Sequence, residues 1–211
     1  MSQRQRLKAR HRWQPMRRLS LSLMGLGVSS EIAAITGMVL GILAGFSFMA
    51  TREPFNPHLF WLVGAVCCIL RIGCIRLDTF LHHQNSQHSV EEIFFTELPE
   101  RVSDAVTIIG FGFAASSSPW LGLASALAAI FSAYIRSLGV MRGAGKKRAS
   151  IGPMTRIHRL ALISLTSVLM LFPITSGLKT PIPHIALWVM LFGCLATILL
   201  RWFKLKEFDE T

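Results

Sequence analysis

Acidic residues gather between positions 78 and 104 of this sequence. Six of the 11 acidic residues fall there: Asp78, Glu91, Glu92, Glu97, Glu100 and Asp104. The spacing of Glu97, Glu100 and Asp104 places these three on one face of a helix. Carboxylate oxygens are the ligands of Mg²⁺, which commonly joins protein carboxylates to substrate phosphates. The cluster therefore predicts a divalent-cation site for a phosphorylated substrate.

Basic residues follow the acidic cluster and are expected on the same side of the molecule. They are Arg136, Lys146, Lys147, Arg148, Arg156, His158 and Arg159. Arginine suits phosphate because its guanidinium can donate two parallel hydrogen bonds, whereas lysine acts as a point charge. Zinc at His82, His83 and His88 is an alternative, but the spacing forms no helix-face pair, and solvated loop histidines are commoner.

The composition predicts that these residues lie in an integral membrane protein. The chain has 211 residues, of which 52% are hydrophobic and only 16% charged. Several nearly uncharged runs approach the 20 residues that a membrane-spanning helix needs. The four cysteines lie in or beside these runs without CxxC spacing, so we interpret them as buried apolar residues rather than as a disulfide or metal site.

The pattern of apolar runs predicts an all-α membrane domain of six transmembrane helices. The predicted spans cover residues 21–49, 57–77, 101 to the turn at 116–120, 121–140, 160–174 and 185–202. A basic juxtamembrane segment (1–20) precedes the six-helix domain (21–203), and a short tail (204–211) follows it. Gly37, Gly41 and Gly45 form a small-residue stripe that lets another helix approach closely, within the chain or in a homodimer.

The distribution of basic residues predicts the orientation. Of the 22 Lys and Arg residues, the loops assigned to one side hold only Arg52 and Lys179. The positive-inside rule then places both termini and the acidic cluster in the cytoplasm of a cell with the domain in its inner (plasma) membrane. The seven basic residues in positions 1–20 are interpreted as an anchor on anionic headgroups, since no aromatic platform supports nucleic-acid binding.

The segment TELPERVSDAVTIIGFG, preceded by LRIGCIRLD and followed by AYIRSLG and GPMTRIHR, resembles the CDP-alcohol phosphatidyltransferase family. The family motif is D-x2-D-G-x2-A-R, a spacer, then G-x3-D-x3-D, at the cytoplasmic surface of six spanning helices. Its second half matches Thr96, Glu100 and Asp104. In its first half, Asp78 matches the second Asp, while Ile75 stands at the first Asp, Thr79 at the Gly, and His82 and His83 at Ala-Arg.

The resemblance implies an enzyme of phospholipid biosynthesis. Such enzymes use two Mg²⁺ or Mn²⁺ ions to engage the diphosphate of a CDP-linked lipid, and an alcohol attacks it with release of CMP. By position, Asp78, Glu100 and Asp104 would be metal ligands, Asp104 also the general base, and Glu97 a replacement for the ligand missing at Ile75. The substrate-binding candidates are Thr79, His83, Arg136, His158 and Arg159. Family members are usually dimers.

The departures from the motif leave a second hypothesis open. Ile75 cannot bind a metal, Thr79 adds a side chain where close backbone approach is expected, and His83 is a weaker phosphate ligand than arginine near neutral pH. A catalytically degenerate member with a structural or regulatory role is therefore the alternative. A small transporter ranks below both, because mid-span charge is nearly absent. Asp104 itself, costly inside a span, needs a metal, Arg71 or Arg101 as partner.

Overall fold

The computed structural model describes residues 30–53, 56–82, 90–142, 151–172 and 181–209, without the side chains of residues 78–82, 90–97 and 207–209. In these ranges the chain forms helices and no strand. The helices are α3 (Ser30–Ala50), α4 (Pro57–His82), α5 (Val90–Gly112), α6 (Pro119–Met141), α8 (Arg156–Leu169) and α10 (Ile182–Asp209). The predicted all-α class is confirmed for the described residues.

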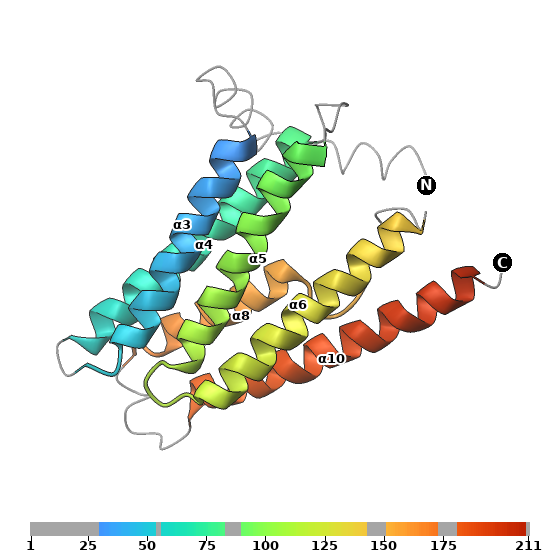
Figure 1. Ribbon diagram of the computed structural model, residues 1–211. Coiled ribbons are helices and arrows are strands. Elements are labelled where there is room, and N and C mark those ends of the chain that lie inside the picture. The colour runs from blue at the N-terminus through green and yellow to red at the C-terminus, as the bar shows by residue number, and fades with distance from the viewer. Residues whose placement is uncertain (1–29, 54–55, 83–89, 143–150, 173–180, 210–211) are drawn as a thin grey trace, which may run out of the picture.

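The helices form two groups joined by α5 and α8 (Figure 1). In the first group α3 packs against both α4 and α5, and in the second α6 packs against α10. α5 also contacts α6, and α8 contacts both α4 and α10. The start of α8 therefore lies where the two groups meet.

The glycine stripe predicted on α3 packs against α5. A Cβ atom on Gly45 would lie 2.6 Å from the carbonyl oxygen of Val106, and one on Gly41 would overlap the hydroxyl of Ser103. This close approach lets the hydroxyl of Thr107 donate a hydrogen bond of 3.0 Å to the carbonyl of Gly41. Small residues allow such backbone contact between helices. Of the two interpretations of the stripe, the structure supports packing within the chain.

An aromatic cluster closes the end of the first group opposite the start of α3. The rings of Phe48, Trp61 and Phe111, from α3, α4 and α5, lie with centroids 5.3–6.0 Å apart. Tilted and edge-on arrangements at this distance are favourable for aromatic pairs. Cys67, Cys68 and Cys194 are buried in the same core and free, and Cys74 is free and half-buried. The interpretation of the cysteines as buried apolar residues is thus confirmed for these three.

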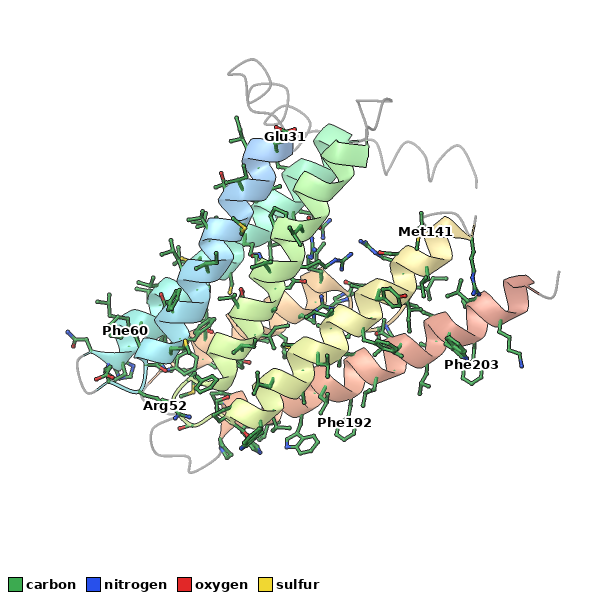
Figure 2. The ribbon with its side chains drawn as sticks, in the orientation of Figure 1. Glu31, Arg52, Phe60, Met141, Phe192 and Phe203 are labelled. Carbon is green, nitrogen blue, oxygen red and sulfur yellow. The ribbon has the colours of Figure 1, made fainter. Side chains whose placement is uncertain are left out.

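Within the described residues, four helices are long and apolar enough to cross a membrane: α3, α4, α6 and α10. Their outer faces carry large exposed apolar side chains, and Figure 2 shows Phe192 and Phe203 of α10 pointing away from the bundle. A soluble protein rarely exposes so large an apolar surface. The chain is therefore a membrane protein, whereas six transmembrane helices are not confirmed.

The remaining two helices differ from the predicted spans. α5 begins at Val90 rather than near Arg101 and continues through Pro99, so four of the six acidic residues lie in its first half. α8 has only 14 residues and ends at Leu169, short of the predicted 174. Fourteen residues extend about 21 Å, less than the roughly 30 Å of a bilayer core. Conversely, α4 and α10 extend beyond their predicted ends at 77 and 202.

Candidate functional site

Asp104 is a buried carboxylate on α5 that contacts three arginines. Its Oδ1 accepts a hydrogen bond of 2.5 Å from Arg71 Nη2 of α4. Its Oδ2 accepts one of 2.9 Å from Arg159 Nη2 and one of 3.2 Å from Arg156 Nε, both at the start of α8. The expected partner Arg71 is thus confirmed, and both carboxylate oxygens are engaged.

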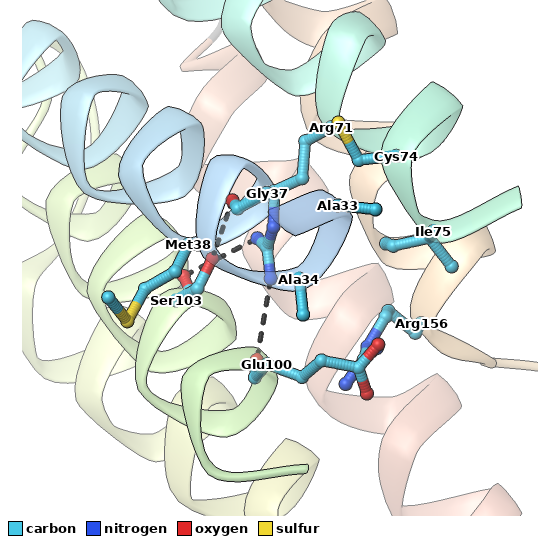
Figure 3. A pocket seen from close by; sticks show the side chains of 10 residues that line it. All are labelled: Ala33, Ala34, Gly37, Met38, Arg71, Cys74, Ile75, Glu100, Ser103 and Arg156. Carbon is cyan, nitrogen blue, oxygen red and sulfur yellow. Dashed lines mark hydrogen bonds and ion pairs between the residues drawn. The ribbon is translucent and has the colours of Figure 1, made fainter. Parts of the chain in front are cut away.

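Arg71 is the most completely buried of these arginines, with 2% of its surface exposed. Besides Asp104, it donates to the hydroxyl of Thr107 at 3.1 Å and to the carbonyls of Ser103 and Glu100 at 3.4 Å. Figure 3 shows its guanidinium directed from α4 toward α5. Buried charges are tolerated only when paired and hydrogen-bonded, and Arg71 satisfies both conditions.

Asp104 and the three arginines form a cluster, which a second carboxylate, that of Glu100, joins at its more exposed side. Arg156 Nη1 lies 2.5 Å from Glu100 Oε1, and about a sixth of each side chain is exposed (15% and 17%). Burial lowers the pKa of Arg156, but the charges of Asp104 and Glu100 outweigh burial and raise this pKa above its usual value. The guanidinium therefore stays charged and links the two acidic residues of α5.

The cluster carries an excess of positive charge and of hydrogen-bond donors. Three guanidinium groups face two carboxylates, which leaves a net charge of +1. Arg156 Nη2 and Arg159 Nε are buried without a hydrogen-bond partner in the part of the chain that the structure describes. Buried donors without partners are costly, so these two N–H groups suit an anionic ligand.

A small pocket, partly open to solvent, lies beside the cluster and has room for about one water molecule. Figure 3 shows polar and apolar side chains interleaved around it, with Met38 beside Ser103 and Ile75 beside Arg156. The lining residues are Ala33, Ala34, Gly37, Met38, Arg71, Cys74, Ile75, Glu100, Ser103 and Arg156. Arg71 and Arg156 supply guanidinium groups to this pocket, and guanidinium groups suit phosphate oxygens.

The described side chains do not fit a divalent cation. Both oxygens of Asp104 accept hydrogen bonds from arginines, Glu100 pairs with Arg156, and Ile75 contributes no oxygen to the pocket. No group of three or more His, Cys, Asp or Glu side chains converges within the described residues. Asp78 lies on α4 and Glu97 on α5, but their side chains fall outside the description, so their assignment as metal ligands stays a prediction.

The predicted substrate-binding residues do not all lie in the cluster. Arg159 belongs to the cluster, whereas Arg136 is half-buried near the end of α6. His158 is exposed, and its Nδ1 lies 3.0 Å from the hydroxyl of Thr155 and accepts a hydrogen bond from the Thr155 amide, so the ring caps α8. Thr79 lies on α4 with an undescribed side chain, and His83 lies outside the described residues.

Arg201 of α10 is a basic residue that the sequence analysis did not select for the site. It is 7% exposed and donates to the carbonyl of Ser132 at 2.5 Å and to that of Ile151 at 2.9 Å. The charges of Arg136, Arg159 and Arg101 act on it by repulsion. A second basic region thus adjoins the cluster, and the arginine inside the apolar run ILLRWF was the available signal.

Comparison with known proteins supports the fold. No protein-family model and no curated protein matches the sequence. Among solved structures, the apo form of Mycobacterium tuberculosis phosphatidylinositol phosphate synthase matches with a TM-score of 0.65 and 14% identity, over 89% of this chain and 94% of that one. Its complex with manganese and citrate matches with a TM-score of 0.66 and 14% identity, over 89% and 87%. The resemblance to the CDP-alcohol phosphatidyltransferase family is thereby confirmed at the level of the fold.

Proposed function

We propose that this chain is a membrane transferase that moves a phosphatidyl group from a CDP-linked lipid, such as CDP-diacylglycerol, to an alcohol, with release of CMP. The observation that carries the proposal is the placement of Asp104, Arg156 and Arg159 beside a pocket in a fold similar to phosphatidylinositol phosphate synthase. Arginines bind phosphate oxygens in pairs, so this arginine-rich site fits a diphosphate.

In the proposed reaction the acceptor hydroxyl attacks the lipid-side phosphorus. A new phosphorus–oxygen bond forms to the acceptor, the bond to the CMP phosphate breaks, and the hydroxyl proton passes to a base. Arg156 and Arg159 bind the diphosphate oxygens through donors that include the two N–H groups without a hydrogen-bond partner among the described residues. When both arginines turn toward the diphosphate, Oδ2 of Asp104 becomes the oxygen that accepts the proton, while Arg71 stays on Oδ1.

The second basic region is proposed to bind a charged group on the acceptor. Arg136 and Arg159 are near enough to Arg201 for their charges to act on it, and a bound phosphate would offset this repulsion. His158 stays a predicted member of this region, since its described role is to cap α8.

The location and assembly follow as further parts of the proposal. We propose the cell inner membrane as the location, and the positive-inside rule then predicts both termini and the cluster at the cytoplasmic side, where CDP-linked lipids would meet soluble acceptors. A homodimer is predicted from the family resemblance alone.

The test is CMP release from CDP-diacylglycerol by the purified full chain, across several acceptor alcohols, in buffers with Mn²⁺ and with EDTA. We expect turnover that Asp104→Asn lowers by at least about 100-fold, since a positioned base contributes that much or more. Glu53→Gln, an exposed acidic residue after α3, is the matched control and should leave turnover unchanged. Equal turnover in Asp104→Asn and Glu53→Gln would contradict the mechanism.

A catalytically degenerate protein is the second candidate, and Ile75 favours it. This residue lines the pocket at the position where the family motif has its first Asp. If the folded protein releases no CMP with any acceptor, and Ile75→Asp produces measurable release, the degenerate interpretation holds. Robust turnover by the unmodified chain excludes it.

A further inference from the structure

Arg71 occupies the side of Asp104 that faces α4, the helix on which the family motif places its first two Asp residues. We propose that Arg71 takes the place of a divalent cation at Asp104, and that Arg156 and Arg159 bind a diphosphate directly, without a metal ion. The diphosphate as ligand class rests on the proposed function, but the absence of a metal requirement does not, because it follows from the charges around Asp104.

Both carboxylate oxygens of Asp104 already contact arginines. Oδ1 is 2.5 Å from Arg71, and Oδ2 lies within 3.2 Å of both Arg156 and Arg159. A divalent cation bound there would have to displace a guanidinium and would still lie among three positive charges. Because Asp104 is buried, screening by water is weak and the repulsion is large.

The face of α4 that lines the pocket presents Arg71 and Ile75. Arg71 and Ile75 are four residues apart, so they lie one above the other on one helix face, and both line the pocket. This face carries an apolar residue where the motif has a carboxylate, and a guanidinium one turn earlier. Among the described side chains of this face there is no carboxylate, and Arg71 already supplies a positive charge to Asp104.

The charge and the hydrogen-bond donors of this site favour an anionic ligand. With Asp104 and Glu100 neutralised by Arg71, Arg156 and Arg159, the cluster keeps one positive charge, and two buried N–H groups have no partner among the described residues. Phosphate oxygens are the acceptors that arginine binds in pairs. The site therefore fits a diphosphate without an intervening ion.

The experiment uses inorganic pyrophosphate as probe and the full chain in detergent, after removal of metals. Calorimetric titration measures pyrophosphate affinity in EDTA and in Mn²⁺, and electron paramagnetic resonance measures how much Mn²⁺ the protein binds. We expect affinities in EDTA and Mn²⁺ that agree within about twofold, and weakening of about tenfold or more in Arg159→Gln, because a charged hydrogen bond is lost. The exposed Arg52→Gln is the matched control with unchanged affinity.

Three results would overturn the proposal: pyrophosphate binding that requires Mn²⁺, Mn²⁺ binding that disappears in Asp104→Asn, or no pyrophosphate binding in either buffer. Thermal stability of each variant separates loss of the site from loss of folding. The outcome is independent of turnover. Metal-free pyrophosphate binding without CMP release would contradict the proposed function alone, and CMP release that depends on Mn²⁺ held by Asp104 would contradict this inference alone.

Discussion

Arg71 ties three helices together through one guanidinium. It extends from α4 to Asp104, Thr107 and two backbone carbonyls of α5, and Thr107 in turn bonds to the carbonyl of Gly41 on α3. Removing one member of a buried ion pair costs more than the pair contributes, because the other charge stays buried without its partner. Arg71 is therefore a stabilising residue as well as a part of the candidate site.

Arg71→Met tests this role. The substitution keeps an unbranched side chain but removes the charge, so Asp104 loses its Oδ1 partner and the free energy of unfolding should fall by about 3–5 kcal/mol. Arg52→Met, at an exposed arginine after α3, is the control and should change stability by less than about 0.5 kcal/mol. Equilibrium unfolding of both variants in mixed micelles measures the difference, and equal effects would contradict the role.

Sequence reasoning predicted single charged residues better than their partners. Asp104 was recognisable because a carboxylate near an apolar run is costly, and the same cost pointed to Arg71 or Arg101 as partner. Arg201 was missed because it contacts the backbone carbonyls of Ser132 and Ile151, which are far from it in sequence. Carbonyl groups carry no signature of residue type, so no spacing in the sequence indicates such a contact.

At the scale of elements, the contact between α3 and α5 fixes the position of Asp104. Gly45 faces Gly110 and the backbone of Val106, where a Cβ atom on Gly45 would lie 2.6 Å from the Val106 carbonyl oxygen. The main chain cannot yield as a flexible side chain does, so any added carbon pushes the two helices apart. Such a shift would also move Asp104 relative to α4.

Gly45→Ala should therefore destabilise the protein by about 1–3 kcal/mol, the usual cost of overpacking. Gly73 offers a matched control in α4, because a Cβ atom there meets nothing within 4 Å. Gly73→Ala should raise the free energy of unfolding by about 0.5–1 kcal/mol, since alanine favours the helix. Thermal unfolding of the two variants compares them directly, and destabilisation by both would argue against the close α3–α5 contact.

The helices whose ends were predicted least accurately from the sequence, α5 and α8, are those that carry the site. Four apolar runs predicted α3, α4, α6 and α10, because hydrophobicity alone identifies a buried or lipid-facing helix. α5 was placed too late because its first half is charged and contains Pro99, a residue that usually ends a helix. α8 mixes polar and apolar residues on different faces, which gives a weaker signal than a uniformly apolar run.

At the scale of the whole molecule, the predicted orientation assigns the two ends of the bundle to opposite sides of the membrane. Arg52 follows α3 at one end, whereas Met141, the last residue of α6, lies at the other (Figure 2). The predicted orientation places the end with Met141 in the cytoplasm and the end with Arg52 outside. Both placements, Met141 in the cytoplasm and Arg52 outside, hold only if α5 crosses the membrane.

Cysteine labelling of Arg52→Cys and Arg142→Cys tests this topology. If α5 crosses, α6 starts outside and ends in the cytoplasm, so a membrane-impermeant maleimide should label position 52 in intact cells and position 142 only after permeabilisation. If α5 stays on one side, the direction of α6 reverses and position 142 labels in intact cells as well. The parent chain is the control, because Cys67, Cys68 and Cys194 are buried and any background label must come from the half-buried Cys74. We expect the first pattern, since α5 packs along α3 between the same two ends of the bundle.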